Sequence, residues 1–166
     1  LLLRYGRTLS LDRDAGSEEL TEARDGFLAS DQRDAAAEAE LLIGDLAWRR
    51  GMGEEAQTHI ERAMTLADGL PPTPELAAVK SHLARYFMVA GRHDDAIRIG
   101  REALGIAQDL DLADLQAFAM SSLGTALINR GDTDEGFRDL EEGIAIAERA
   151  NSPWHITRGQ VNLGVG

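Results

Sequence analysis

Apolar residues recur three and four positions apart along most of the chain, as in Ile99, Ala103, Ile106, Ala107 and Leu110. This spacing places apolar side chains on one side of a helix, whereas a half-buried strand would alternate apolar and polar residues. The pattern predicts pairs of helices, each with a first and a second member. We expect first helices over 35–50, 75–90 and 113–130, second helices over 54–68, 94–109 and 134–150, and a last helix from Pro153 toward Gly166.

The predicted pairs repeat with a period of 40 residues, which is the signature of a stacked repeat architecture. Blocks that begin at Gly51, Gly91 and Gly131 each start 40 residues after the one before. An earlier, shorter repeat aligns with a shift of 33 residues, which matches Ala23, Phe27 and Ser30 to Ala56, Ile60 and Ala63. The repeat predicts an all-α fold in which helix pairs stack into an α-α superhelix with first helices on its concave face.

Glycines occupy two kinds of place in this repeat. Gly51, Gly91 and Gly131 follow first helices, where a left-handed residue ends a helix. Other glycines lie inside helices, although each costs about 1 kcal/mol there relative to Ala. We therefore expect close helix packing at these interior positions, which are Gly124, Gly136, Gly143 and Gly164.

The repeat resembles the tetratricopeptide repeat (TPR) family. One unit shows a small-residue pair and a large residue in the first helix, Leu83-Ala84 and Phe87, and two alanines in the second, Ala96 and Ala103. The 40-residue period is similar to a long variant in large bacterial regulators, the LuxR-type activators and ATPase signalling proteins. The resemblance implies one array over 1–166, with repeats at about 1–32, 33–72, 73–112 and 113–152 and a partial one at 153–166, taken from a longer protein.

Composition narrows the function classes. The chain has no Cys, which excludes disulfides and thiol chemistry, and no apolar run long enough for a membrane span. A net charge of −12 disfavours direct binding to nucleic acid or anionic lipid. No phosphate loop, nucleophile elbow or metal-ligand spacing occurs, so we expect no enzyme, no cofactor, no metal, and a cytoplasmic location.

The concave face is the expected partner-binding site. Helical spacing puts apolar, hydroxyl, amide and charged groups on the inward side of the first helices, a mixture that suits an amphipathic or extended segment. The candidate residues are Asp45, Trp48, Arg49, Ser81, His82, Arg85, Met88, Phe118, Ser121, Thr125 and Asn129. Trp48 and Phe118 are equally compatible with packing between repeats. The family's clamp for the C-terminus of a partner polypeptide needs more Lys, Arg and Asn residues than this face offers, so we do not expect it.

These observations favour a protein–protein interaction module in a multidomain bacterial regulatory protein, with a peptide or helical segment in the groove. Two alternatives remain open. The groove would be a sensor for a small ligand or signal peptide, if several polar groups converged on one pocket. The chain would be a self-associating spacer, if the open ends of the array paired between copies.

Overall fold

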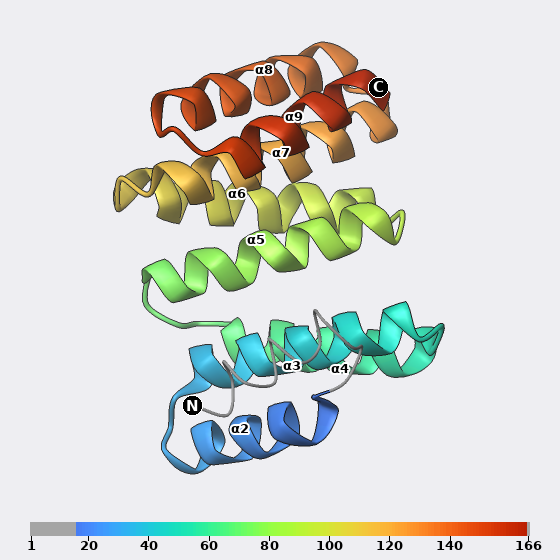
Figure 1. The fold of residues 1–166 in the computed structure, drawn as a ribbon, viewed down its shortest axis with the longest axis vertical. Helices are drawn as coiled ribbons and strands as arrows, with labels where there is room; N and C mark the ends of the chain where they lie inside the picture. Colours follow the sequence, from blue (N-terminus) through green and yellow to red (C-terminus); the bar gives the residue numbers. More distant parts are fainter. Residues whose placement is uncertain (1–15, 166) are drawn as a thin grey trace. The chain divides into compact units, whose positions relative to one another are not determined.

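The computed structural model describes residues 16–165; residues 1–15, which include the first half of the expected repeat 1–32, and Gly166 lie outside the described part. The chain divides into two compact units, which we describe separately: unit 1 ends at Leu70 and unit 2 begins at Pro71. Unit 1 contains α2 (Ser17–Ala29), α3 (Arg33–Arg49) and α4 (Gly53–Ala67) (Figure 1). Unit 2 contains α5 (Pro74–Val89), α6 (His93–Asp109), α7 (Ala113–Arg130), α8 (Thr133–Arg149) and α9 (Pro153–Val165).

The all-α prediction is confirmed, since the described residues form helices and no strand. The expected first and second helices begin and end within two residues of those in the structure. The core is built mainly from aliphatic side chains: Leu46 and Ile60 are buried in unit 1, and Leu83, Leu127 and Leu140 in unit 2, where the aromatic Phe87 is buried with them. Alanines occupy much of the remaining core, which lets the helices approach one another closely.

The first helices α3, α5 and α7 are each followed by the predicted left-handed glycine. Gly51, Gly91 and Gly131 have φ values of +76°, +73° and +108°. The residue after each glycine donates its N–H to a carbonyl five positions earlier, as from Met52 to Ala47 at 2.9 Å. This bond gives a hydrogen-bond donor to a carbonyl of the last helical turn, which would otherwise lack one. The glycine spacing thus fixes the turn within each helix pair.

The turns after the second helices correct the alignment of the earliest repeat. Asp31, Asp111 and Asn151 share a left-handed φ of 53–57°, a conformation that Asp and Asn tolerate. Asp31 precedes Asp111 by 80 residues, so α2 follows the 40-residue period. The 33-residue shift was wrong, because it pairs the exposed Ser30 with a buried alanine, whereas the 40-residue period pairs the buried Leu20 with the buried Ile60.

Close packing at interior glycines is confirmed at three of the four predicted positions. A Cβ added to Gly136 would lie 2.6 Å from the carbonyl oxygen of Gly124, and the reverse substitution meets the same distance. A Cβ at Gly143 would lie 3.1 Å from the Cβ of Met120. The expectation was wrong at Gly164, where no described atom lies within 4 Å of the added carbon.

The proline-rich stretch before α5 acts as a helix start. Pro74 is the first residue of α5, where its missing N–H costs nothing, and Thr73 accepts a bond from the Leu76 N–H at 3.1 Å. The boundary between the two units falls in this stretch. One uninterrupted array over 1–166 stays a prediction.

Candidate partner-binding face

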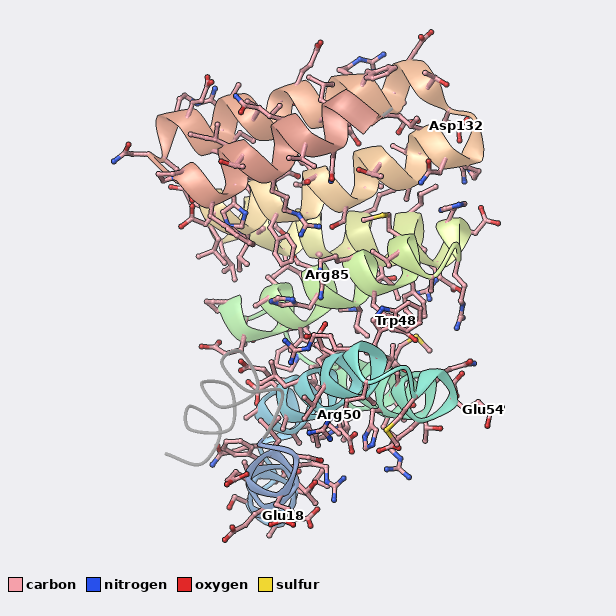
Figure 2. The ribbon with its side chains drawn as sticks, turned by 45° about the vertical axis from the view of Figure 1, so that its right-hand side comes forward. Glu18, Trp48, Arg50, Glu54, Arg85 and Asp132 are labelled. Carbon is pink, nitrogen blue, oxygen red and sulfur yellow. The ribbon has the colours of Figure 1, made fainter. Side chains whose placement is uncertain are left out.

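The three predicted site residues of unit 1 lie on the last turns of α3. Trp48 is 45% exposed, and Figure 2 labels it near the end of this helix. Asp45 and Arg49 are one helical turn apart, and the Arg49 Nε lies 3.8 Å from a carboxylate oxygen of Asp45. This corner of unit 1 therefore presents an indole beside an ion pair.

In unit 2 the first helices α5, α7 and α9 follow one another along the unit (Figure 1). Three of the predicted site residues are used to pack these helices. Ser81 is fully buried and donates to the Ala77 carbonyl of its own helix at 2.8 Å. Phe118 and Ser121 are 6% and 3% exposed. They fix the shape of the face and offer little surface to a partner.

The other predicted residues of unit 2 are more accessible. His82 and Asn129 are exposed, and Arg85, Met88 and Thr125 are half-buried. Figure 2 shows the Arg85 side chain on α5. These residues combine an imidazole, a guanidinium, a thioether and an amide, so the face can donate hydrogen bonds and also cover apolar surface.

Aromatic and cationic groups meet around the Phe118 ring. The His82 ring packs edge-on against it with centroids 4.8 Å apart, and the His155 ring lies at 5.7 Å. The Arg158 guanidinium carbon lies 4.9 Å from the Phe118 centroid, and its Nη2 donates to the Ser122 hydroxyl at 3.2 Å. We call these five residues the Phe118 cluster.

The α9 members of this face were not among the residues predicted from the sequence. Asn162 donates to the Ser121 hydroxyl at 2.9 Å, which ties α9 to α7. The signal was present, because His82 contacts Phe118 and Ser122 contacts Arg158 at the same separation of 36 residues. Extending the face by one more period, from Phe118 to Arg158, would have found it.

Burial perturbs two groups of the Phe118 cluster. Burial, with help from the positive charge of Arg85, lowers the pKa of Arg158 to about 10. Burial also lowers the pKa of His155, although the nearby Asp114 opposes the shift. The Arg158 Nε and the His155 Nδ1 are buried and have no hydrogen-bond partner among the described residues. The cluster thus holds positive charge in a poorly solvated place.

Unit 1 contains a different polar cluster, which the sequence did not predict. Glu40 of α3 is 3% exposed. One of its carboxylate oxygens accepts from the Arg24 Nη1 of α2 at 3.3 Å, and the other lies 2.5 Å from the His59 Nδ1 of α4. A surface hollow of about 400 Å³ lies beside Glu40, with Leu28 and Leu66 among its lining residues. The carboxylate therefore joins α2, α3 and α4, the helices of unit 1 that the structure describes.

The described part of the molecule contains neither a cluster of metal ligands nor a membrane span. No group of three or more His, Asp or Glu residues there is placed to hold a metal ion. No helix there combines the length and the apolar character needed to cross a bilayer.

Solved structures similar to this protein share its fold. A kinesin-light-chain-like protein of Podosopora anserina with nearly identical TPR-like repeats matches with a TM-score of 0.72 and 18% identity over 97% of this chain and 82% of that one. BtubC (BKLC) from P. vanneervenii matches with a TM-score of 0.64 and 19% identity, over 98% and 78%. Aspartyl phosphate phosphatase F from Bacillus subtilis matches with a TM-score of 0.65 and 14% identity, over 91% of this chain and 41% of that one.

Comparison with curated protein sequences gives no match. Family profiles match most of the described residues. Two profiles described as tetratricopeptide repeat cover residues 35–109 and 119–156. Repeats of this kind generally mediate protein–protein interaction, and their fold is typically a non-catalytic module. The chain belongs to the tetratricopeptide repeat family.

Proposed function

We propose that the chain is a protein-interaction module whose first helices bind a peptide or helical segment of a partner. The observation that carries this proposal is that α5 and α7 contain two groups of residues, one that packs the helices together and one that is exposed to solvent. Phe118, Ser81 and Ser121 pack the helices together, while His82 and Asn129 stay exposed. A rigid face with accessible polar groups binds a segment without first having to order itself.

Exposed and half-buried apolar side chains on the first helices α3 and α5 favour an amphipathic partner segment. Val89 is 55% exposed on α5, and Met88 beside it is half-buried. Trp48 offers a large apolar surface on α3 of unit 1. Interfaces concentrate binding energy on such anchors, with polar groups around them.

We place this module in a larger bacterial regulatory protein of the cytoplasm. The support is the 40-residue period, which is similar to that of the long-period repeats in such regulators. The test is to read the coding sequence on both sides: a neighbouring ATPase or helix-turn-helix domain supports the placement, and a secretion signal contradicts it.

Selection of a random peptide library on the immobilised protein tests segment binding. We expect selected peptides to bind in solution. Trp48→Ala should weaken the Kd of peptides that bind unit 1 about tenfold, and Arg85→Glu the Kd of peptides that bind unit 2, as loss of one anchor does. Arg138→Glu is the matched control, because it makes the same charge change on the exposed side of the second helix α8. Selected peptides that bind all three variants as tightly as the parent would overturn the proposal, provided that circular dichroism shows unchanged helicity.

A further inference from the structure

The turns that follow second helices are not all alike. In the described part of the chain the second helices are α2, α4, α6 and α8, and the turns after α2, α6 and α8 share one arrangement. In each, the residue just before the next helix donates its N–H to a carbonyl of the preceding helix, with N···O distances of 2.8–2.9 Å. The carbonyl of the same residue accepts the first bond of the next helix. These linking residues are Gln32, Leu112 and Ser152.

The turn over residues 68–73, between α4 and α5, cannot form this link. By the 40-residue period, Pro72 occupies the place of Leu112, and a proline has no N–H to donate. Pro71 occupies the place of Asp111, whose φ is +53°, whereas the proline ring holds φ at about −65°. The connection therefore runs from 68 to 73, where the ordinary one runs from 110 to 112.

The two helix ends at this turn are satisfied separately. The Arg33 Nη2 of α3 donates to the carbonyl oxygens of Thr65 and Asp68 at 3.3 and 3.2 Å, so the end of α4 is held within unit 1. The start of α5 is capped by its own neighbour, because the Thr73 hydroxyl accepts from the Leu76 N–H at 3.1 Å. Neither helix end depends on a hydrogen bond to the other helix, as it does in the ordinary turns.

Gly69 supplies conformational freedom in this turn. Its φ of +67° lies in the left-handed region, and no described atom lies within 4 Å of a Cβ added there. A glycine moves between backbone conformations at little steric cost. After it, Pro71, Pro72 and Pro74 fix their own φ and restrict the residues before them. The turn therefore combines one freely rotating residue with a stiff segment that leads into α5.

We propose that the turn over residues 68–73 is a hinge, through which units 1 and 2 change their relative orientation. Hinges consist of a few residues at the ends of elements that absorb changes in φ and ψ. The boundary between the two compact units lies in this turn. The inference goes beyond the proposed function, because it concerns the connection between the units and holds for any partner. The turn over 110–112, inside unit 2, is expected to keep its helices in one orientation.

Distances between spin labels test the hinge. The chain has no Cys, so two introduced cysteines are the only labelling sites. Thr58→Cys with Arg98→Cys spans the turn over 68–73. Arg98→Cys with Arg138→Cys spans the ordinary turn over 110–112 and is the matched control, because all three positions are exposed and 40 residues apart on α4, α6 and α8. In double electron–electron resonance we expect the first pair to give a distance distribution at least about twofold broader than the control, as rotation about a hinge requires.

A variant with the ordinary turn chemistry identifies the cause. Pro71→Asp with Pro72→Leu introduces the residue types of Asp111 and Leu112, so the left-handed residue and the linking N–H become available. We expect the distribution of the first pair to narrow to the width of the control. Circular dichroism and an unchanged distribution of the control pair in the same variant show that the fold is retained.

Two results would overturn the proposal. One is a parent protein whose first pair gives a distribution as narrow as that of the control, since the units then keep one orientation. The other is a broad distribution that stays broad in the folded variant with Pro71→Asp and Pro72→Leu, since the motion then does not come from the missing link in this turn.

Discussion

Residues 80 positions apart occupy the same places in units 1 and 2, with different chemistry. In unit 1, Arg24, Glu40 and His59 lie on α2, α3 and α4, and their charged and polar groups meet around one buried carboxylate. The counterparts in unit 2 are Leu104, Met120 and Asp139, on α6, α7 and α8. Met120 packs in an apolar cluster with Leu104 partly buried against it.

Asp139 completes the comparison, because it is a carboxyl group without the partners that Glu40 has. Burial and the negative charges of Glu135 and Glu142 raise its pKa, and Arg101 and Arg138 only partly offset them. We call the place where these side chains of three helices meet the junction of each unit. The same arrangement of helices is thus compatible with a charged junction, as in unit 1, or with a largely apolar one, as in unit 2. A charged junction depends on every member, whereas an apolar one depends on volume.

The largest effect is expected from Glu40→Ala. Removing one partner of a buried ion pair leaves the others uncompensated, at about 3–5 kcal/mol. Urea unfolding followed by circular dichroism, with hydrogen exchange at the amides of α3 and α4, measures the loss. A loss below about 1 kcal/mol would show that the cluster around Glu40 is solvated. It would contradict the view that unit 1 depends on a buried charged cluster where unit 2 has apolar side chains.

The double variant Arg24→Leu with Glu40→Met tests the same difference between the two units, because it introduces into unit 1 the residue types that unit 2 has at the corresponding positions. An apolar replacement of similar volume often restores the stability of a buried ion pair. We expect the double variant to unfold at a higher urea concentration than Glu40→Ala. An equal or lower midpoint would mean that the charged junction has no apolar substitute in unit 1.

Gly136→Ala is expected to have the second largest effect. The added Cβ would lie 2.6 Å from both the Gly124 carbonyl oxygen and the Ile128 Cγ1, so α7 and α8 must move apart. Overpacking costs about 1–3 kcal/mol, which exceeds the gain in helix propensity of about 1 kcal/mol. The matched control is Gly105→Ala on α6, where no atom lies within 4 Å and the propensity gain should stabilise the fold. Equal changes in urea midpoint for the two variants would contradict close packing at Gly136.

The sequence was sufficient for the helices and their turns because both depend on local chemistry. Apolar spacing and the glycine at the end of each first helix act within a few residues, and the structure has them where they were expected. The earliest repeat was misaligned because Ala23, Phe27 and Ser30 imitate the small–large–small pattern at the wrong offset. The left-handed turn at Asp31, which decides the alignment, has no strong sequence signal.

The candidate site was predicted less well, because it depends on contacts between repeats. Which side of a first helix faces solvent is set by the neighbouring first helix, and 36 to 41 residues separate the contacting residues. Phe118 and Ser121 were placed on the correct helix, but its neighbours bury them. Arg158 was missed because the expected face ended one repeat too early, and Glu40 because an isolated acid in a helix is usually solvated.

Gly44→Ala is expected to have a smaller effect than Gly136→Ala. Its added Cβ would lie 3.0 Å from the Ile60 Cδ1, the end of a side chain that can rotate, and 3.3 Å from the Ala56 carbonyl oxygen. Repacking and helix propensity partly cancel, so we expect a net loss of about 1 kcal/mol or less. Hydrogen exchange at the amides of α3 and α4 measures it. A loss as large as that of Gly136→Ala would mean that α3 and α4 pack as rigidly as α7 and α8.

The smallest effect, and the only stabilising one at a junction position, is expected from Asp139→Asn. Because its pKa is raised in the folded state, the Asp139 carboxylate destabilises the fold at pH 7, and protonation removes that penalty as the pH falls through the folded pKa. The variant should therefore have a higher Tm than the parent at pH 7, and the difference should vanish near pH 3, below the ordinary pKa of Asp of about 3.9. Glu141→Gln, an exposed residue of α8 with the same change in charge, is the control. A gain for Glu141→Gln as large as that for Asp139→Asn would assign the effect to net charge, and a gain that persisted at pH 3 would assign it to packing; in either case Asp139 would not be the unpartnered counterpart of His59.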